Sequence, residues 1–470
     1  MADVRDFGAV GDGVADDTAA IEHALADGDG LLVFPRGEYR ISRPIVIDLD
    51  RTRRTGVDGS GGTARIVMTA PGPAVSIIGR HEGTADPKGI TAAVWDRQRM
   101  PTVRSIEITG THPEADGIRL EGFFQATITG VLLRHLRNAI HVTRRGRNLL
   151  VSHCHVYRHT GVGILLDDVN LHQTIIASSH VSYCRLGGIR VVGGEIRNLQ
   201  ITGNDIEYNN NRSIGVPDAD AEPTAEIFID CRTGTVREGT IASNTIQATA
   251  SPGGANIRFL GAGAGGEHRT GMWTIAGNLI GSQAVNIHLS GALGFAISGN
   301  YIYSGHERSI LVEGSRSIAI GANVIGHNPD YGDKELSPGI RLVDCRDATL
   351  SGLVIQDAIA GRNTVAEAAP TRKEALVECV RCRRISLTGC QILEGAPAGL
   401  LLEDCHDVLV SGCTILDDRP APLMRAAIEW RSTPGETPPT GSAVQGCRLQ
   451  DLAAPAGVAT AANIVGPPTR

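Results

Sequence analysis

A short phrase that recurs along the chain constrains its fold more than any other feature. It reads aliphatic, any residue, small residue, Asn or Cys, any residue, aliphatic, as in ITGNDI from Ile201 and ISGNYI from Ile297. The fourth position of its copies is occupied by Val131, Cys154, Ser179, Asn204, Asn244, Asn278, Asn300, Asn323, Leu353, Cys390, Cys413 and Cys447. The shortest spacings between these positions are 22 to 25 residues, and the longer ones fit the same unit with an inserted loop. A repeat of this period predicts a solenoid.

A second phrase keeps pace with the first, as in GIRL from Gly117 and GIRV from Gly188. Short alternating runs separated by Gly and Asn are typical of strands, and these segments show no helical periodicity. Each unit is therefore expected to form one coil, stacked about 4.8 Å from the next. The predicted fold is all-β, a right-handed parallel β-helix of about 12 coils with an N-terminal capping helix.

The Asn and Cys residues of the first phrase have an expected structural role. Stacked Asn side chains at one bend of successive coils can bond backbone groups that the bend leaves unpaired. Cys390, Cys413 and Cys447 would replace them as small buried hydrophobic residues. We predict packing for both ladders in preference to chemistry.

The repeat also predicts the domain organisation. A chain of 470 residues would ordinarily suggest several domains, but solenoids grow in one dimension. We expect a single domain over 1–470, with an N-terminal cap at 1–50, coils over 104–450 and a tail at 451–470. Asp16-Asp17-Thr18, followed by AAIEHALA, predicts a helix that covers the N-terminal end of the coils.

Composition narrows the partners. A formal net charge of −7 argues against nucleic acid, and no apolar run approaches the roughly 18 residues of a membrane span. The residues after Met1 are polar, so localisation stays open between the cytoplasm and export after removal of a leader. We expect no cofactor and no metal. A homo-oligomer such as a trimer is left open.

The opening VRDFGAVGDGVADDTAAIEHAL, followed by FPRGEY, resembles the N-terminal cap of pectate-lyase-superfamily proteins over roughly forty residues. The resemblance implies a parallel β-helix and chemistry on a sugar polymer. Members include polygalacturonases, pectate and alginate lyases, mannuronan epimerases, fructan-cleaving transferases and phage tailspikes. The chain lacks the Asn-Thr-Asp, Gly-His-Gly and Arg-Ile-Lys set of polygalacturonases and the Asp-Pro-His-Glu of one epimerase type. Its three lysines, Lys88, Lys334 and Lys373, disfavour a lyase with a lysine base.

Strand alternation predicts which side chains leave the coils, because Ile and Leu point inward. The outward column of the second phrase reads Arg119, His141, Leu165, Arg190, Phe228, Arg258, His288, Leu311 and Arg341. Guanidinium groups in a row suit the carboxylates or sulfates of an acidic polysaccharide. We therefore expect Arg119, His141, Arg190 and Arg258 to bind substrate. The alternative is a solvated face on which Arg stems cover apolar surface.

The predicted catalytic groups are carboxylates. Asp205 and Glu207 would project from one strand about 6.8 Å apart, a separation that suits glycoside hydrolysis. The insertion 209–225 would wall a cleft, and Glu226 and Asp230 would face out beyond it, beside Arg190 and Asp167. The alternative is that these are surface carboxylates paired with arginines.

Three further residues complete the predicted site. His180 and Tyr157 would lie beside the acid pair, and Trp95 would stack on a sugar ring. The stack His155-His180-Asp205 could converge on a metal, but packing is the preferred interpretation.

The leading functional hypothesis is a glycoside hydrolase that uses these paired carboxylates. A lyase, in which Arg190 removes the proton α to a uronate carboxylate, and a fructan-type transferase are the alternatives among enzymes. A tailspike-like or surface glycan-binding protein without turnover is the alternative of another class. The sequence does not decide the sugar, the linkage, endo or exo action, or the stereochemical outcome.

Overall fold

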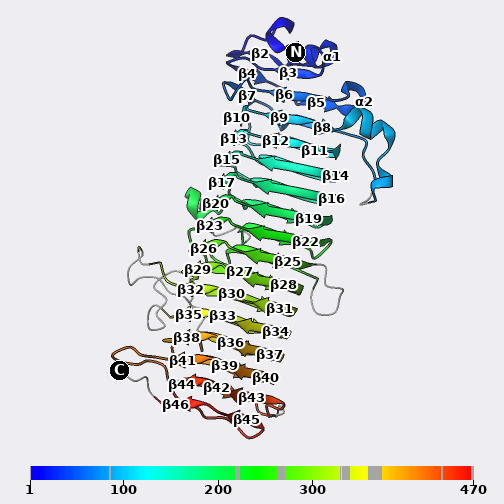
Figure 1. Cartoon of the computed structure of the whole chain (residues 1–470). Coiled ribbons are helices and arrows are strands. Elements are labelled where there is room, and N and C mark those ends of the chain that lie inside the picture. Colours follow the sequence, from blue (N-terminus) through cyan, green and yellow to red (C-terminus); the bar gives the residue numbers. More distant parts are fainter. Residues whose placement is uncertain are drawn as a thin grey trace. The chain divides into compact units, whose positions relative to one another are not determined.

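The computed structural model describes residues 2–83, 86–216, 223–262, 270–328, 330, 339–357, 373–435 and 438–466. The chain divides into two compact units, Met1–Thr240 and Ile241–Arg470, and each is described by itself. In both units short strands stack rung upon rung in parallel (Figure 1). The predicted all-β parallel β-helix is confirmed. The number of coils, the capping role of the helix and the single domain remain predictions.

In unit 1 (Met1–Thr240), three series of parallel strands make up the coils. Series I contains β5 (Ile45–Asp48), β8 (Gly72–Ile78), β11 (Ala115–Phe124), β14 (Ile140–Ser152), β16 (Ile164–Ala177), β18 (Ile189–Val192) and β21 (Ala225–Asp230). Series II contains β1 (Ala2–Asp3), β3 (Leu31–Val33), β6 (Gly56–Asp58), β9 (Thr102–Arg104), β12 (Thr127–Thr129), the second halves of β14 and β16, β19 (Glu195–Thr202) and β22 (Thr235–Ala242). Series III contains β2 (Asp12–Asp16), β4 (Gly37–Ile41), β7 (Ala64–Met68), β10 (Glu107–Gly110), β13 (Leu132–Arg134), β15 (His155–Tyr157), β17 (His180–Ser182) and β20 (Asp205–Glu207).

The helices of unit 1 are short. The predicted N-terminal helix is present as α1 (Thr18–Asp27), which buries Ile21 and Ala24. The others are η1 (Val4–Phe7), α2 (Leu49–Thr52), η2 (Pro87–Gly89), η3 (Val94–Gln98) and η4 (Arg212–Ile214). None of the helices in the described ranges is long and apolar enough to cross a membrane.

Unit 2 (Ile241–Arg470) repeats the arrangement. Series I contains β24 (Ala255–Leu260), β27 (Val285–Ser290), β30 (Arg308–Glu313), β33 (Ile340–Val343), β36 (Val377–Val380), β39 (Ala398–Glu403) and β42 (Ala426–Arg431). Series II contains β25 (Thr270–Ala276), β28 (Ala292–Ser298), β31 (Arg316–Ile320), β34 (Arg346–Ser351), β37 (Arg383–Thr388), β40 (His406–Ser411), β43 (Ser442–Gln445) and β45 (Val458–Ala461). Series III contains β23 (Thr245–Gln247), β26 (Leu279–Gly281), β29 (Tyr301–Tyr303), β32 (Val324–Gly326), β35 (Val354–Gln356), β38 (Gln391–Leu393), β41 (Thr414–Leu416), β44 (Arg448–Leu449) and β46 (Ile464–Val465).

Alternation along each strand separates the core from the outer surface. In series I of unit 1, Ile118, Ile140, Ile164, Ile189 and Ile227 are fully buried inside the coils. They are also neighbours in register from rung to rung. The residue after each of them leaves the coil on the outside, as the sequence predicts. The register therefore lines up the predicted outward column within each unit.

The predicted Asn ladder is present. In unit 2 the side-chain amide of Asn244 donates to Asn278, that of Asn278 to Asn300 and that of Asn300 to Asn323, at 3.0, 2.9 and 2.9 Å. Further along, the position is taken by buried Cys390, Cys413 and Cys447, whose thiols donate to backbone carbonyls.

Candidate active site

The predicted acid pair lies on the outer side of series III in unit 1. Asp205 and Glu207 flank the fully buried Ile206 on β20, so both side chains leave the strand on the same side and are half-buried. His180 is the register neighbour of Asp205, and Ser182 that of Glu207. The structure therefore brings the pair together on one strand, as predicted, and their catalytic role stays a prediction.

Tyr157 and His180 join this surface from the preceding rungs. The Tyr157 hydroxyl lies 3.0 Å from His180 Nδ1, and the rings of His155 and His180 are 5.2 Å apart. Burial raises the pKa of Tyr157, and the negative charges of Asp205 and Glu207 raise it further. The charges of the acid pair thus act on the Tyr157 hydroxyl. Within the described part of the chain, no group of three or more His, Cys, Asp or Glu side chains could hold a metal ion.

Glu226 does not face out, and the expectation of an exposed carboxylate is wrong for this residue. Its side chain lies at the bend where series III passes into series I, in contact with Asn209 at the start of the 209–225 insertion, and only 1% of Glu226 is exposed. Its two oxygens accept hydrogen bonds from the backbone N–H of Asn209 at 2.9 Å and from the Asn209 amide at 2.5 Å. Burial raises the pKa of Glu226 to about 8. The rest of the insertion that we predicted to wall a cleft, residues 217–222, lies outside the described residues.

A repeat in unit 2 explains this position. Asn256 and Asn286 occupy the same place at the start of their series I strands, and the Asn256 amide donates to Asn286 at 2.8 Å. Glu226 thus stands where a ladder residue is needed, and its contacts are those of a structural group.

Asp230 lies next to two arginines and is buried, with 7% of its surface exposed, so the expectation of an exposed carboxylate is wrong for it as well. Arg232 donates to its two carboxylate oxygens at 2.9 and 2.6 Å. Burial raises the pKa of Asp230, but these hydrogen bonds and the charges of Arg232 and Arg190 outweigh it and lower the pKa. Asp230 is therefore an ionised, tightly paired carboxylate.

The outward column of series I in unit 1 reads Arg119, His141, Leu165, Arg190 and Phe228, in register from rung to rung. The Arg190 guanidinium lies over the Phe228 ring at 5.2 Å, so the aromatic face holds the cation and Phe228 is buried beneath it. The Nε–H of Arg119 has no hydrogen-bond partner among the described residues. The column is the cationic, partly apolar ridge that the sequence predicts.

A histidine–carboxylate pair stands inside this ridge. Nε2 of His141 lies 3.1 Å from Oδ2 of Asp167, which leaves the next rung two positions further along its strand. A carboxylate can only accept this bond, so Nε2 of the neutral ring carries the hydrogen and Nδ1 keeps a lone pair. No partner of Nδ1 occurs among the described residues. From the sequence we expected Asp167 beside Arg190. Its bond to His141 could have been predicted, because Asp167 follows His141 by one coil plus two positions.

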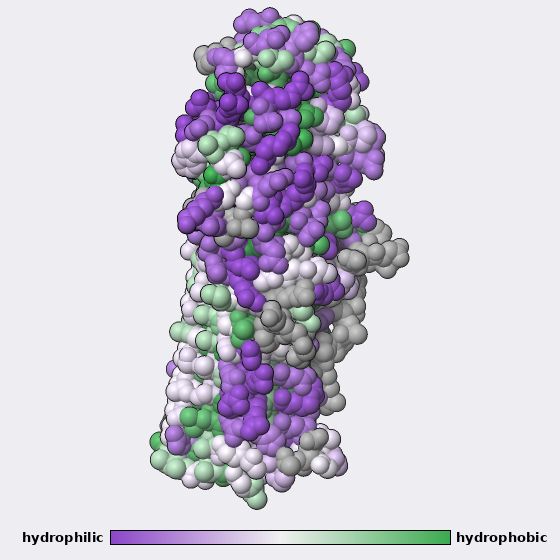
Figure 2. Space-filling model, turned by 90° about the vertical axis from the view of Figure 1, so that its right-hand side faces the viewer, coloured by the Kyte–Doolittle hydropathy of each residue, from purple (hydrophilic) through white to green (hydrophobic). Residues whose placement is uncertain are grey.

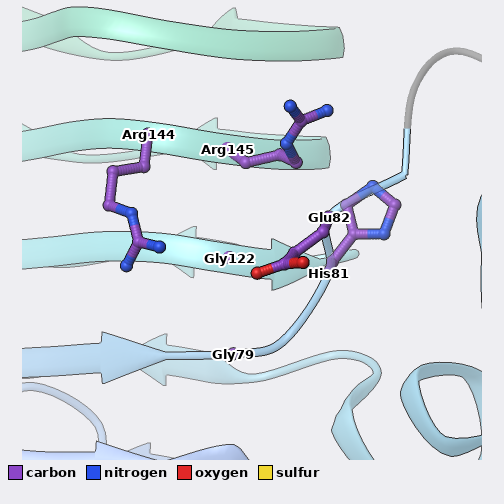
Figure 3. A pocket seen from close by; sticks show the side chains of 6 residues that line it. All are labelled: Gly79, His81, Glu82, Gly122, Arg144 and Arg145. Carbon is purple, nitrogen blue, oxygen red and sulfur yellow. The ribbon is translucent and has the colours of Figure 1, made fainter.

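A cavity of about 330 Å³ borders the ridge and was missed from the sequence. It is lined by Gly79, His81, Glu82, Gly122, Arg144 and Arg145. In Figure 3 the Glu82 carboxylate and the Arg144 guanidinium, which come from different elements, point toward each other across it. Glu121 connects the cavity to the ridge, because its two oxygens lie 3.1 Å from Arg119 and 3.3 Å from Arg144.

The surface around the cavity is polar. The N-terminal half of the face in Figure 2 is covered mainly by hydrophilic residues, with only small hydrophobic patches. Burial lowers the pKa of His81, and the charges of Arg147 and Arg145 lower it further. A ligand of this part of unit 1 is therefore expected to be polar, and the surrounding arginines favour an anion.

The other predicted binding residues are Trp95 and Arg258. Trp95 stands on η3 with 45% of its surface exposed and packs against Phe124 at 5.3 Å. Arg258 belongs to unit 2 and is buried, with its guanidinium bonded to His288 and Gly253, so the expectation that it faces out to bind substrate is wrong. Among the described residues, neither Trp95 nor Arg258 contacts His141.

Comparison with known proteins agrees with the coil fold. Residues 1–234 match the model of a family described as "Rhamnogalacturonase A/epimerase, pectate lyase-like". Residues 1–234 thus match the pectate-lyase-like superfamily, and the strands of both units have the parallel β-helix arrangement typical of it.

Individual relatives match a smaller part of the chain or have a low sequence identity to it. The mannuronan C5-epimerase AlgE2 of Azotobacter vinelandii is 27% identical over 229 residues, which cover 44% of this chain and only 19% of the length of that relative. The A-module of mannuronan C-5 epimerase AlgE6 from Azotobacter vinelandii is 13% identical, with a TM-score of 0.42 over 100% of both chains. The Dettilon tailspike protein is 17% identical, with a TM-score of 0.48 over 91% of this chain and 67% of the other.

Proposed function

We propose that this chain acts on an acidic polysaccharide and removes the proton α to the carboxylate of a uronate unit, with His141 as the base. The observation that carries the proposal is the His141–Asp167 pair, at 3.1 Å, between arginines of one outward column. The similarity to mannuronan C5-epimerases and to a family of rhamnogalacturonases and epimerases supports the choice of substrate class.

In this proposal His141 is the base and the neighbouring charged residues stabilise the charges that form. Nδ1 of His141 accepts the proton from the carbon next to the carboxylate, while Asp167 stabilises the imidazolium that forms and fixes the ring. Arg119, on the rung next to His141, pairs with the substrate carboxylate and stabilises the negative charge that develops there. Arg190, two rungs away on the other side, binds another acidic group of the polymer. An arginine stays protonated near neutral pH. We therefore assign Arg190 to binding instead of the base role of the original lyase hypothesis.

Two products can follow from the same step. If the electron pair expels the sugar oxygen β to the carboxylate, and that oxygen takes up a proton, the chain is cleaved and a C=C bond forms in the uronate. If a proton returns to the carbon from the opposite face, the product is an epimer and no bond is cleaved. We expect elimination, because epimerisation also requires a proton donor across the sugar ring.

The test is substitution of the pair. His141→Gln is expected to lower turnover of a polyuronate at least about 10²-fold, the usual contribution of a general base. His153→Gln, at an exposed turn position of the same unit, is the matched control. The control should retain the wild-type rate. If His141→Gln also retains it, His141 is not the base.

A second candidate function is glycoside hydrolysis by Asp205 and Glu207, the leading hypothesis from the sequence. The observation that favours it is their common projection from β20, where both raise the pKa of Tyr157. In that case Asp205→Asn and Glu207→Gln would each lower activity at least about 10²-fold. The products would be new reducing ends without unsaturated uronate. Under our main proposal the same variants retain most of the activity.

A further inference from the structure

The outward column of unit 2 repeats that of unit 1. In register from rung to rung it reads Arg258, His288, Leu311 and Arg341, the same order of residue types as Arg119, His141, Leu165 and Arg190. The diagonal pair is repeated as well. Nε2 of His288 lies 2.9 Å from Oε2 of Glu313, which leaves the next rung two positions further on, as Asp167 does beside His141.

The two histidines differ at the other ring nitrogen. Nε of Arg258 donates to Nδ1 of His288 at 3.2 Å. A guanidinium can only donate, so Nδ1 holds the lone pair and Nε2 carries the hydrogen bonded to Glu313. Both nitrogens of His288 are therefore occupied, and this ring has no lone pair to offer a substrate. Arg258 itself is 7% exposed and also bonds the carbonyl of Gly253.

Groups that could hold a sugar acid nevertheless reach the surface here. The side chain of Arg341 is 31% exposed and that of Glu313 is 45% exposed. Arg341 and Arg308 both pair with the buried Glu378, and the charge of Arg341 also acts on the exposed Glu313, so Arg341 and Glu313 reach the surface close to each other. The hydrogen bond from His288 lowers the pKa of Glu313 and keeps it an acceptor.

We propose that unit 2 carries a second, non-catalytic subsite for a uronate unit, built from Arg341, Glu313 and the clamped His288. The guanidinium of Arg341 pairs with the sugar carboxylate, and the ionised Glu313 accepts bonds from sugar hydroxyls. The ligand class rests on the proposed function of unit 1. The subsite itself is tested by binding alone, without turnover.

The experiment is calorimetric titration of the full chain carrying His141→Gln, which keeps the ligand intact, with a short oligogalacturonate and a short oligomannuronate. Two binding events per chain are expected. Adding Glu313→Ala or Arg341→Gln should remove one event or weaken it at least about tenfold, the effect of losing one charged hydrogen-bonding group. Arg346→Gln, an exposed arginine on series II of the same unit, is the matched control and should leave both events in place.

The outcomes separate the two proposals. If only one binding event is seen and Glu313→Ala or Arg341→Gln abolishes it, the subsite in unit 2 is supported and the binding site proposed in unit 1 is contradicted. Events that both substitutions leave unchanged, or the absence of binding, overturn the subsite. Turnover assays of His141→Gln test the proposed function separately, because they do not depend on binding in unit 2. Circular dichroism of each variant checks that a loss of binding is not a loss of fold.

Discussion

At the scale of single residues, one acid that the sequence marked as catalytic has a structural place instead. Glu226 was expected to face solvent because Ile227 and Ile229 point inward, and these two isoleucines are buried as predicted. What the parity could not predict is the cover provided by Asn209, which lies 17 residues earlier in an irregular segment. Alternation indicates on which side a residue leaves a strand, but it does not indicate what lies on top of it.

This burial predicts a pH-dependent stability. The pKa of Glu226 is raised from 4.5 to about 8 in the folded state. The stabilisation from its proton is thus fully present below about pH 4.5 and is lost as the pH rises through about 8. Over that window the loss is at most about 1.4 kcal/mol per pH unit. The urea midpoint of the wild type should fall with pH relative to that of Glu226→Gln. Glu114→Gln, at an exposed position, should parallel the wild type. Parallel curves for Glu226→Gln would contradict the buried acid.

Asp167, the hydrogen-bond partner of His141, gives a second prediction for a single residue. Replacing Asp167 by Asn removes the negative charge that stabilises the imidazolium but leaves an oxygen that can accept the bond from Nε2. We expect a loss of kcat of about 10- to 10⁴-fold with a smaller change in KM. Steady-state kinetics on a polyuronate measures this. A loss confined to KM would make Asp167 a binding residue.

At the scale of elements, the ladder at the bend between series II and III maintains the stack. Asn300 donates to Asn323 and to the carbonyl of Ile275, at 2.9 and 3.0 Å, and accepts from Asn278. Each Asn rung thereby satisfies backbone groups of its neighbours, which explains why Asn recurs at this position in successive coils.

Substitution in the ladder tests its contribution. Asn300→Ala leaves buried donors and acceptors unpaired, at about 1–3 kcal/mol each. Asn300→Cys should cost less, because a thiol can donate to a carbonyl as Cys413 does to Leu387. Chemical denaturation of both variants measures the difference. Thr349→Ala, on the exposed outer side of β34, is the control. Equal losses for Ala and Cys would contradict the role assigned to the thiols.

At the scale of the whole molecule, the coil fold could be predicted far better than the site. Strand positions, the outward column and the ladders follow from residues that repeat once per coil, and the structure has them in register in each unit. The His141–Asp167 pair could not be predicted with the same ease, because its members come from different rungs and different columns. The cavity beside it depends on His81 and Glu82, which lie in an irregular segment without periodicity.

The central claim is that His141 removes a carbon-bound proton from a uronate. Mass spectrometry of a defined oligouronate incubated in D2O with the wild type and with His141→Gln tests it most directly. We predict fragments that lack the elements of water and carry an unsaturated end, and their loss by at least about 10²-fold in the variant. Carbon-bound deuterium in an uncleaved chain would keep His141 as the base but change the outcome to epimerisation. Saturated hydrolysis products alone, or undiminished product formation by His141→Gln, would contradict the claim.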